Sequence, residues 1–526
     1  MSTSAPYHTT IRVDEVIQQM NKLLHAVENE ELANAHLLSQ VHPANYQSAR
    51  NLIHYMALRS FDLRQLQEQL TSLGVSSIAH AEGYVLMTIN NIIRLLYLLK
   101  GETISHPAGR LSPPFNYYQS REQLLKNTDA LFGLQKEGDN RTRVMVTMPV
   151  LAASDFPLLV DLMNAGMDLI RINTSHDQPE QWKAMIDNIR KAEEETQRRC
   201  LVYIDLSGPK LRAEKPILLR EDQTERIKHN GSIRLFKGDW VVVISPELHP
   251  FELELPDRVI LSVPVTLPEI FQDVEVGHSI FFDDGKIGGR IVFRTENYFL
   301  VEIFQAAISG TGLGAEKGIN LPETALTLSS LTHNDYATLP FIAKYADIVG
   351  YSFVRRPSDV EKLQSTLSEL GRPDIGIVLK IETKEAFDYM PHLLLTAMRN
   401  PKVGIMIARG DLAVEVGFER NAEVQEEILW ICESAHVPGI WATQVLDRMA
   451  KKGLATRSEI TDAAMASRAE CVMLNKGPHI VDAVNTLENI IKRMERHQRK
   501  RWGSLRPLSV ARRFVHDIIH LPPESK

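Results

Sequence analysis

One lysine and two carboxylates are spaced so that they could share a divalent cation. Lys380 and Glu382 lie at the end of the apolar run 376–381, and Asp411 follows the apolar run 404–408. Mg²⁺ and Mn²⁺ bind oxygen ligands and keep open positions for substrate oxygens. An ammonium group beside the metal would add positive charge. Taken alone, the Lys380–Glu382 pair is equally compatible with a solvated strand end, and the segment around Asp411 is the more specific signal.

These residues can meet if their runs are neighbouring strands of a parallel sheet. Such strands have apolar interiors and carry reactive residues at their C-terminal ends. Eight apolar runs alternate with amphipathic helical segments after residue 141. The runs are 144–147, 169–173, 201–205, 347–352, 375–381, 403–407, 439–443 and 471–474. Eight β–α units in series predict an α/β chain with a (β/α)8 TIM barrel.

The long gap between the third and fourth runs has another pattern. Apolar and polar residues alternate with period two at 232–236, 240–244 and 298–303, with turn residues between them. We therefore predict a small all-β domain, 214–312, inserted between barrel segments 139–213 and 313–496. An insertion at this end of a barrel would cover the site as a lid.

The two ends of the chain differ from the barrel. Apolar residues recur at helical spacing up to about residue 100, which predicts a helical domain. The region after it is rich in Pro, Gly, Asn and Ser and predicts a linker, so that domain and linker together cover 1–138. We interpret this domain as a packing domain, with an oligomer contact or a regulatory surface as alternatives. The basic residues of 497–526 predict a solvated tail rather than a polyanion-binding segment.

Bulk composition excludes several classes of protein. The 526 residues are 44% hydrophobic and 24% charged, as in a multidomain globular protein. The net charge of −7 gives no sign of nucleic acid or membrane as a partner. Three well-separated cysteines, with no secretory signal at the first residues, favour a reducing, cytoplasmic location.

The second, third and seventh runs end in, or are followed by, further polar residues. They are Arg171, Asn173, Ser175, His176, Asp205, Lys210, Arg212 and Thr443. Arginine, lysine and a divalent cation together bind phosphate and carboxylate groups. Phosphoryl transfer needs such a site. Aldolase-like enolate chemistry needs a similar set, so the residue types leave the reaction open.

These segments resemble the hallmark sequences of the pyruvate kinase family. The matching stretches are 165–176, 205–212, 282–287, 317–322, 379–382, 407–412, 442–446 and 456–459. The resemblance extends over about 141–495. It implies phosphoryl transfer from phosphoenolpyruvate to ADP, giving pyruvate and ATP, by a homo-oligomer that binds Mg²⁺ or Mn²⁺.

The family's residue roles can be carried over to this sequence. Glu382 and Asp411 resemble its metal ligands. Lys380 resembles the lysine that stabilises the phosphoryl group in transit, and Arg171 the arginine on that group. Thr443 resembles the threonine beside the enolpyruvate methylene.

Other roles concern the substrate carboxylate and the nucleotide. The backbone of Ala408–Asp411, including Gly410, resembles a helix N-terminus that binds the carboxylate. His176 and Arg212 resemble contacts to the nucleotide phosphates. Asp284 resembles a lid residue that approaches the nucleotide metal.

One departure concerns potassium. Most family members have Glu at the position of Lys210, and they require K⁺ bound by residues that resemble Asn173, Ser175 and Asp205. The ammonium group of Lys210 can replace that charge, and Leu206 matches the family's K⁺-independent variant. We therefore predict activity without K⁺.

Three further departures affect other contacts. The loop 147–154, which touches the nucleotide base in the family, differs here and leaves the nucleotide preference open. The loop 475–479 also differs. About thirty residues follow the barrel where the family has a C-terminal domain with an effector site, so we expect that effector site to be missing.

Two other functions remain as alternatives. One is a metal-dependent aldolase or lyase that forms an enolate on the same barrel. The other is a homologue that binds phosphoenolpyruvate and signals through its helical domain.

Overall fold

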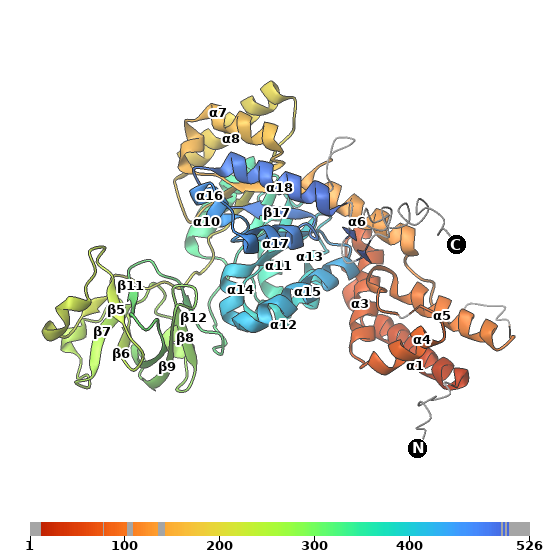
Figure 1. Ribbon diagram of the computed structural model, residues 1–526, viewed down its shortest axis with the longest axis horizontal. Helices are drawn as coiled ribbons and strands as arrows, with labels where there is room; N and C mark the ends of the chain where they lie inside the picture. The colour runs from red at the N-terminus through yellow and green to blue at the C-terminus, as the bar shows by residue number, and fades with distance from the viewer. Residues whose placement is uncertain are drawn as a thin grey trace, which may run out of the picture. The chain divides into compact units, whose positions relative to one another are not determined.

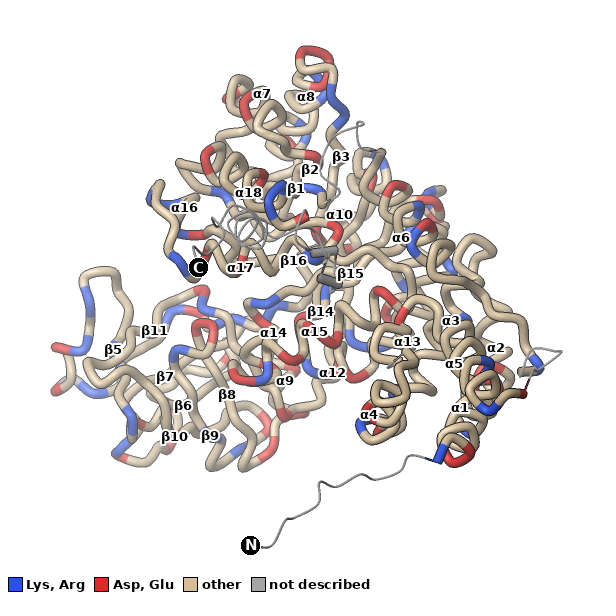
Figure 2. The backbone as a smooth tube through the Cα atoms, turned by 45° about the vertical axis from the view of Figure 1, so that its right-hand side comes forward, with Lys and Arg blue, Asp and Glu red and all other residues tan. Residues whose placement is uncertain are grey.

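The computed structural model describes residues 12–76, 78–102, 109–134, 142–495, 498–499 and 502–503. Of the predicted basic tail it describes the short strands β18 (Gln498–Arg499) and β19 (Trp502–Gly503), and the rest lies outside the described residues. Within the described ranges, every helix is too short or too polar to cross a membrane. Acidic and basic residues are interspersed along these elements (Figure 2).

Eight parallel strands form a closed barrel in the order β1-β17-β16-β15-β14-β13-β3-β2, which confirms the predicted fold class. Figure 1 labels one of these strands, β17. The strands are β1 (Arg143–Thr147), β2 (Leu169–Asn173), β3 (Leu201–Asp205), β13 (Ile348–Tyr351), β14 (Gly376–Ile381), β15 (Val403–Ala408), β16 (Gly439–Ala442) and β17 (Cys471–Leu474). Each lies within one or two residues of a predicted run. The strands are buried over nearly their whole length, which explains their continuous apolar sequences.

Helices alternate with these strands along the chain. They are α7 (Phe156–Ala165), α8 (Pro179–Thr196), α10 (His333–Tyr345), α11 (Pro357–Glu369), α12 (Lys384–Asp388), α13 (Met390–Ala397), α14 (Arg409–Val416), α15 (Phe418–Ser434), α16 (Asp447–Lys452), α17 (Arg457–Ala466) and α18 (Ile480–Met494). The helix α14 begins immediately after β15, so the first turn of the helix directly follows the end of the strand.

The insert between β3 and α10 is an all-β domain with one short α-helix, α9 (Ile270–Asp273), and two 3₁₀ turns, Glu221–Arg226 and Pro250–Glu252. Its seven-stranded sheet has the order β12-β8-β9-β10-β6-β7-β4, and β11 pairs with β5. The strands are β4 (Ile217–Leu218), β5 (Ile233–Leu235), β6 (Trp240–Ile244), β7 (Val259–Pro264), β8 (Ser279–Phe282), β9 (Ile287–Arg294), β10 (Tyr298–Gln305), β11 (Thr311–Leu313) and β12 (Ile319–Asn320).

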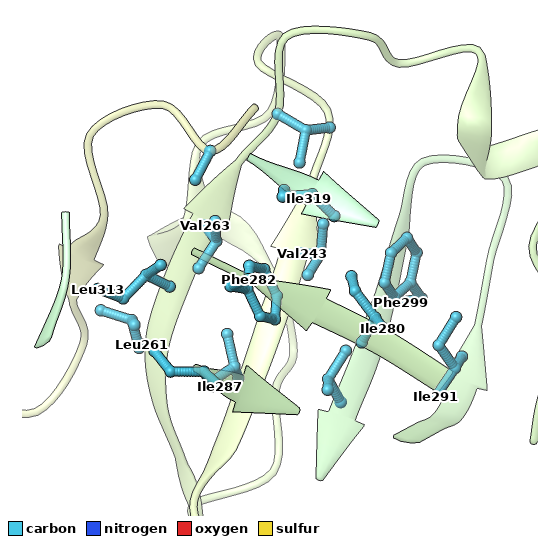
Figure 3. Packing of buried hydrophobic residues seen from close by; sticks show 14 of the residues in the cluster. Val243, Leu261, Val263, Ile280, Phe282, Ile287, Ile291, Phe299, Leu313 and Ile319 are labelled. Carbon is cyan, nitrogen blue, oxygen red and sulfur yellow. The ribbon is translucent and has the colours of Figure 1, made fainter. Parts of the chain in front are cut away.

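Hydrophobic packing covers both faces of this sheet. Val241 and Val243 belong to the main core, with Phe282 and Phe299 (Figure 3). Alternate residues of the same strand, such as Val242, enter a second cluster. Because the side chains of a strand alternate between faces, β6 has to be apolar throughout.

The N-terminal helices are α1 (Val13–Ala33), α2 (Ala35–Leu38), α3 (Tyr46–Arg59), α4 (Arg64–Ser72) and α5 (Val85–Leu99). Residues from α1, α3, α4 and α5 form their shared core. Asn51, fully buried, joins them to the barrel helix α15, because its amide donates to the backbone oxygens of Glu82 (2.7 Å) and Ser434 (2.8 Å) and accepts from the N–H of Val85 (3.0 Å).

The predicted linker was wrong over 117–132, where the structure has the helix α6 (Tyr117–Phe132). A capping box starts this helix: the Asn116 side chain accepts from the Gln119 N–H, and the Gln119 side chain accepts from the Asn116 N–H. Proline and glycine before residue 116 concealed this local signal. Within the rest of the predicted linker, residues 103–108 and 135–138 lie outside the described residues.

The end of α6 packs against the beginning of two barrel strands, at a notch formed by Gly376 and Gly404. The Leu131 side chain lies 2.6 Å from the place that a Cβ would take at Gly376 and at Gly404. These glycines open β14 and β15, whose other ends carry the candidate site. The absence of a side chain at both positions therefore makes room for Leu131.

The described chain separates into two compact units. One contains 1–133, 171–179 and 201–439, and the other contains 134–170, 180–200 and 440–526, each within its described ranges. The helical domain, the insert and most candidate site residues belong to the first unit. Thr443 belongs to the second.

Replacing Leu131 with alanine is expected to lower the free energy of unfolding by about 2–4 kcal/mol, because it leaves a cavity at the notch. Thermal and urea unfolding followed by circular dichroism measures this loss. Leu134→Ala is the matched control, since Leu134 is 87% exposed and should change little. Equal stability of the two variants would contradict the packing role of Leu131.

Candidate active site

The site is built around a buried ammonium group. Lys380 on β14 is 7% exposed, and its Nζ donates to Ser352 Oγ at 2.7 Å. The same Nζ lies 3.1 Å from Glu382 Oε1 and 3.5 Å from Asp205 Oδ2. Burial by itself would lower the pKa of Lys380, but the carboxylates of Asp205 and Glu382 outweigh it and raise that pKa. The lysine is therefore held in its charged form.

A second cation shares the same carboxylate. Arg171 Nε donates to Asp205 Oδ2 at 2.6 Å, and its Nη2 also contacts this oxygen. The Tyr203 hydroxyl donates to Asp205 Oδ1 at 2.8 Å. Burial opposes ionisation of Asp205, but Arg171 and Lys380 lower its pKa below the ordinary value. Asp205 thus fixes two positive charges in one place.

The two predicted metal ligands come close enough to influence each other. Burial raises the pKa of Glu382, and the charge of Asp411 adds to this rise against the opposing charge of Lys380. The backbone N–H of Phe353 donates to Glu382 Oε2 at 2.6 Å. Two carboxylates whose charges repel in a buried place would be relieved by a shared cation.

The donor set fits Mg²⁺ or Mn²⁺ better than zinc. Among the described residues, no three His, Cys, Asp or Glu side chains gather as a metal site. Glu382 and Asp411 offer oxygen donors, so a cation that they hold would keep positions for water and substrate oxygens, as magnesium sites commonly do.

Lys210 reaches the same place from the loop after β3. Its Nζ lies 3.0 Å from both carboxylate oxygens of Asp411. It also lies 5.9 Å from the ring centroid of Phe353. The ammonium group neutralises Asp411 in this structure.

The start of α14 provides backbone donors at the site. Ala408 precedes the helix, and Gly410 and Asp411 lie in its first turn. The N–H groups of a first turn lack helical partners and attract anions. In the pairing of β14 with β15, Ile381 lies opposite Ile407. Glu382, the next residue, therefore lies beside the start of α14.

Most of the remaining predicted residues of the first unit are more exposed than this cluster. Ser175 and His176 are exposed in the turn after β2, and the Ser175 N–H donates to the Asn173 side chain at 3.2 Å. Arg212 Nη1 donates to a backbone oxygen at 3.0 Å. Asp284 is exposed, in the left-handed region at φ +55°. Leu206, by contrast, is 1% exposed.

Thr443 is described within the second unit. It directly follows β16 and has a φ of +64°. A non-glycine residue in this backbone region is uncommon and is often found at functional sites.

The sequence prediction missed Ser352 and Phe353. Ser352 Oγ accepts from Lys380 and donates to the Leu206 backbone oxygen at 2.6 Å. Phe353 has a φ of +53°, which turns its N–H toward Glu382. Ser352 ends the fourth predicted run and Phe353 follows it, so the sequence placed both at a strand end, but no local pattern marked their hydrogen bonds.

Fold and site together define a TIM-barrel protein with a β insert and a buried lysine–carboxylate cluster at the ends of its strands. The family model for the pyruvate kinase barrel domain matches residues 139–478. The chain belongs to the pyruvate kinase family.

Individual relatives support this assignment. The chain is 33% identical to a pyruvate kinase of Bacillus licheniformis over 362 residues, which are 68% of this chain and 57% of that protein. It is 32% identical to a pyruvate kinase of Geobacillus stearothermophilus, with the same shares covered. The pyruvate kinase of Staphylococcus aureus (strain USA300) is 31% identical over 66% of this chain and 56% of its own length. The match thus spans little more than half of these relatives.

Gly350 on β13 has no side chain, and the side chains of Tyr203 and Asp205 occupy the space that one would take. A Cβ at this position would collide with Tyr203 Oη and Asp205 Oδ1. Gly350→Ala is therefore expected to lower the free energy of unfolding by about 1–3 kcal/mol. Thermal unfolding measures this, with Gly314→Ala as the control because its nearest atom would be 3.5 Å away. A Gly350→Ala protein as stable as the wild type would contradict this packing.

Proposed function

We propose that this protein transfers a phosphoryl group from phosphoenolpyruvate to ADP or another nucleoside diphosphate, giving pyruvate and the triphosphate. The proposal is supported by the family of the chain. The observation that carries it is the buried Lys380 ammonium group between Asp205 and Glu382. A positive charge fixed in advance is what a phosphoryl group in transit requires.

The side chains divide the work as follows. Lys380 and Arg171 stabilise the negative charge of the phosphoryl group as it moves. Lys380 also faces the oxygen that becomes an enolate. The first turn of α14 binds the substrate carboxylate through its N–H groups. Mg²⁺ or Mn²⁺, held by Glu382 and Asp411, would polarise the substrate oxygens.

Three residues are proposed to bind the nucleotide. His176 and Arg212 contact its phosphates, and Asp284 approaches its metal from the insert. Thr443 assists protonation of the enolate. The loop after β1 forms a short 3₁₀ helix with Val150 and Leu151 exposed, and we propose that it influences the choice of base.

Two other activities would use part of this site. A metal-dependent aldolase or lyase could use Lys380, Glu382 and Asp411, but it needs neither a nucleotide cover nor the pair Lys210 and Arg212. A phosphoenolpyruvate sensor would bind that compound without turnover. The intact cluster favours the transferase.

A coupled assay with phosphoenolpyruvate, Mg²⁺ and several nucleoside diphosphates tests the proposal. Pyruvate should form only when a diphosphate is present. Turnover of an enolate precursor without a nucleotide would favour the lyase, and tight binding without turnover would favour the sensor.

Lys380→Met should lower turnover by about 10²–10³-fold, since one charge contact in a transition state contributes about 3–4 kcal/mol. Lys384→Met is the control, because Lys384 is half exposed and pairs with Asp388 at 2.7 Å on the helix α12. A Lys380→Met variant within tenfold of the wild type would show that Lys380 has another role.

We also propose that activity does not require K⁺. The proposal is supported by the ammonium group of Lys210, which lies 3.0 Å from Asp411, and by the burial of Leu206, which offers no side-chain ligand. Turnover should be equal in buffers that contain Na⁺, tetramethylammonium or K⁺ as the monovalent cation. A many-fold rise with K⁺ would contradict this.

The variant Lys210→Glu extends the potassium experiment. It places a carboxylate against Asp411 in place of an ammonium group, so we expect lower turnover that K⁺ partly restores. The same loss in all three buffers would argue against charge replacement by Lys210.

A further inference from the structure

One edge of the insert contacts the helix that carries Asp411. Asn320 of β12 donates from Nδ2 to Glu415 Oε1 of α14 at 3.0 Å. Nearby, a Cβ at Gly285 would lie 2.9 Å from the Phe418 ring and 3.5 Å from Val414. The insert thus touches this part of the barrel through one hydrogen bond and one close apolar contact.

Both contacts lie beside the loop that carries Asp284. Strand β12 pairs with β8, with Asn320 opposite Phe281, and β8 runs directly into the loop 283–286. Three successive residues of this loop, 283–285, have positive φ angles of 53°, 55° and 80°. The Gly285 oxygen also accepts from Gln305 Nε2 at 2.8 Å. The contact at Gly285 lies within this loop, and the contact at Asn320 lies on the strand paired with β8.

The insert contacts α14, the helix that carries the proposed metal ligand Asp411. Asp411 and Glu415 are four residues apart on α14 and therefore lie on the same face, one turn apart. Burial and the charge of Asp411 raise the pKa of Glu415 to about 7. Asn320 is 6% exposed, so loss of its acceptor would leave a buried amide without this bond.

We propose that Glu415 is a positioning residue. Its hydrogen bond to Asn320, together with the contact between Phe418 and Gly285, holds the loop 283–286 at a fixed place relative to Asp411. This inference rests on the proposed function, in which Asp284 serves the nucleotide and Asp411 the metal. The contact therefore sets the geometry between the nucleotide side and the metal side of the site.

Glu415→Ala and Asn320→Ala test the hydrogen bond. Each should raise the KM for the nucleoside diphosphate about 5–10-fold, the equivalent of one hydrogen bond of about 1–1.5 kcal/mol. The KM for phosphoenolpyruvate should stay near the wild-type value. Phe418→Ala, at a side chain that is 62% exposed, should act in the same direction. Glu419→Ala, on an exposed neighbouring residue, is the control.

A swap of the two groups distinguishes positioning from simple loss of a side chain. Asn320→Asp alone places the new carboxyl group against that of Glu415. It should raise the nucleotide KM at least as much as Asn320→Ala does. Asn320→Asp combined with Glu415→Gln restores a donor and an acceptor, so the nucleotide KM should return to within about twofold of the wild type. A double variant no better than Asn320→Asp would overturn the proposal.

Hydrogen exchange of the loop provides a test without catalysis. Mass spectrometry of peptides covering 281–287 should show faster exchange in Glu415→Ala than in the wild type or in Glu419→Ala. Unchanged exchange would overturn the positioning role. A wild-type protein without turnover would instead refute the proposed function, and the exchange result would still decide the role of Glu415.

Discussion

A buried lysine must have buried partners, and this constraint organises the site. An ammonium group removed from water is costly unless charged and polar groups surround it. Lys380 receives them from neighbouring strands: Ser352 after β13 and Asp205 from β3, with Glu382 following its own strand. Arg171 on β2 extends the cluster. The barrel order β15-β14-β13-β3-β2 places these strand ends next to one another.

The same constraint reaches beyond the charged residues. Gly350 must lack a side chain because Tyr203 and Asp205 occupy its space. At the opposite ends of β14 and β15, two glycines admit Leu131 from the helical domain. The strands that carry the cluster are thus packed at both ends, with the charges at one end and an apolar side chain at the other.

The sequence was sufficient for the barrel and for most of the cluster. Strands buried on all sides are continuous apolar runs, and the charged residues lie at or just after the C-terminal ends of such runs, so Lys380 and Glu382 could be placed in advance. The helix α6 was missed because its apolar residues are few and its capping box stands beside proline and glycine. Ser352 and Phe353 were missed because a serine hydroxyl and a backbone N–H become functional only through tertiary contacts that no local pattern encodes.

Anomalous scattering from a crystal soaked in manganese tests the central claim most directly, because it locates the cation without relying on turnover. A metal site formed by two repelling carboxylates predicts one strong peak between the side chains of Glu382 and Asp411, with the Lys210 ammonium group moved away from Asp411. The absence of a peak there, at a manganese concentration that saturates the protein in solution, would contradict the account.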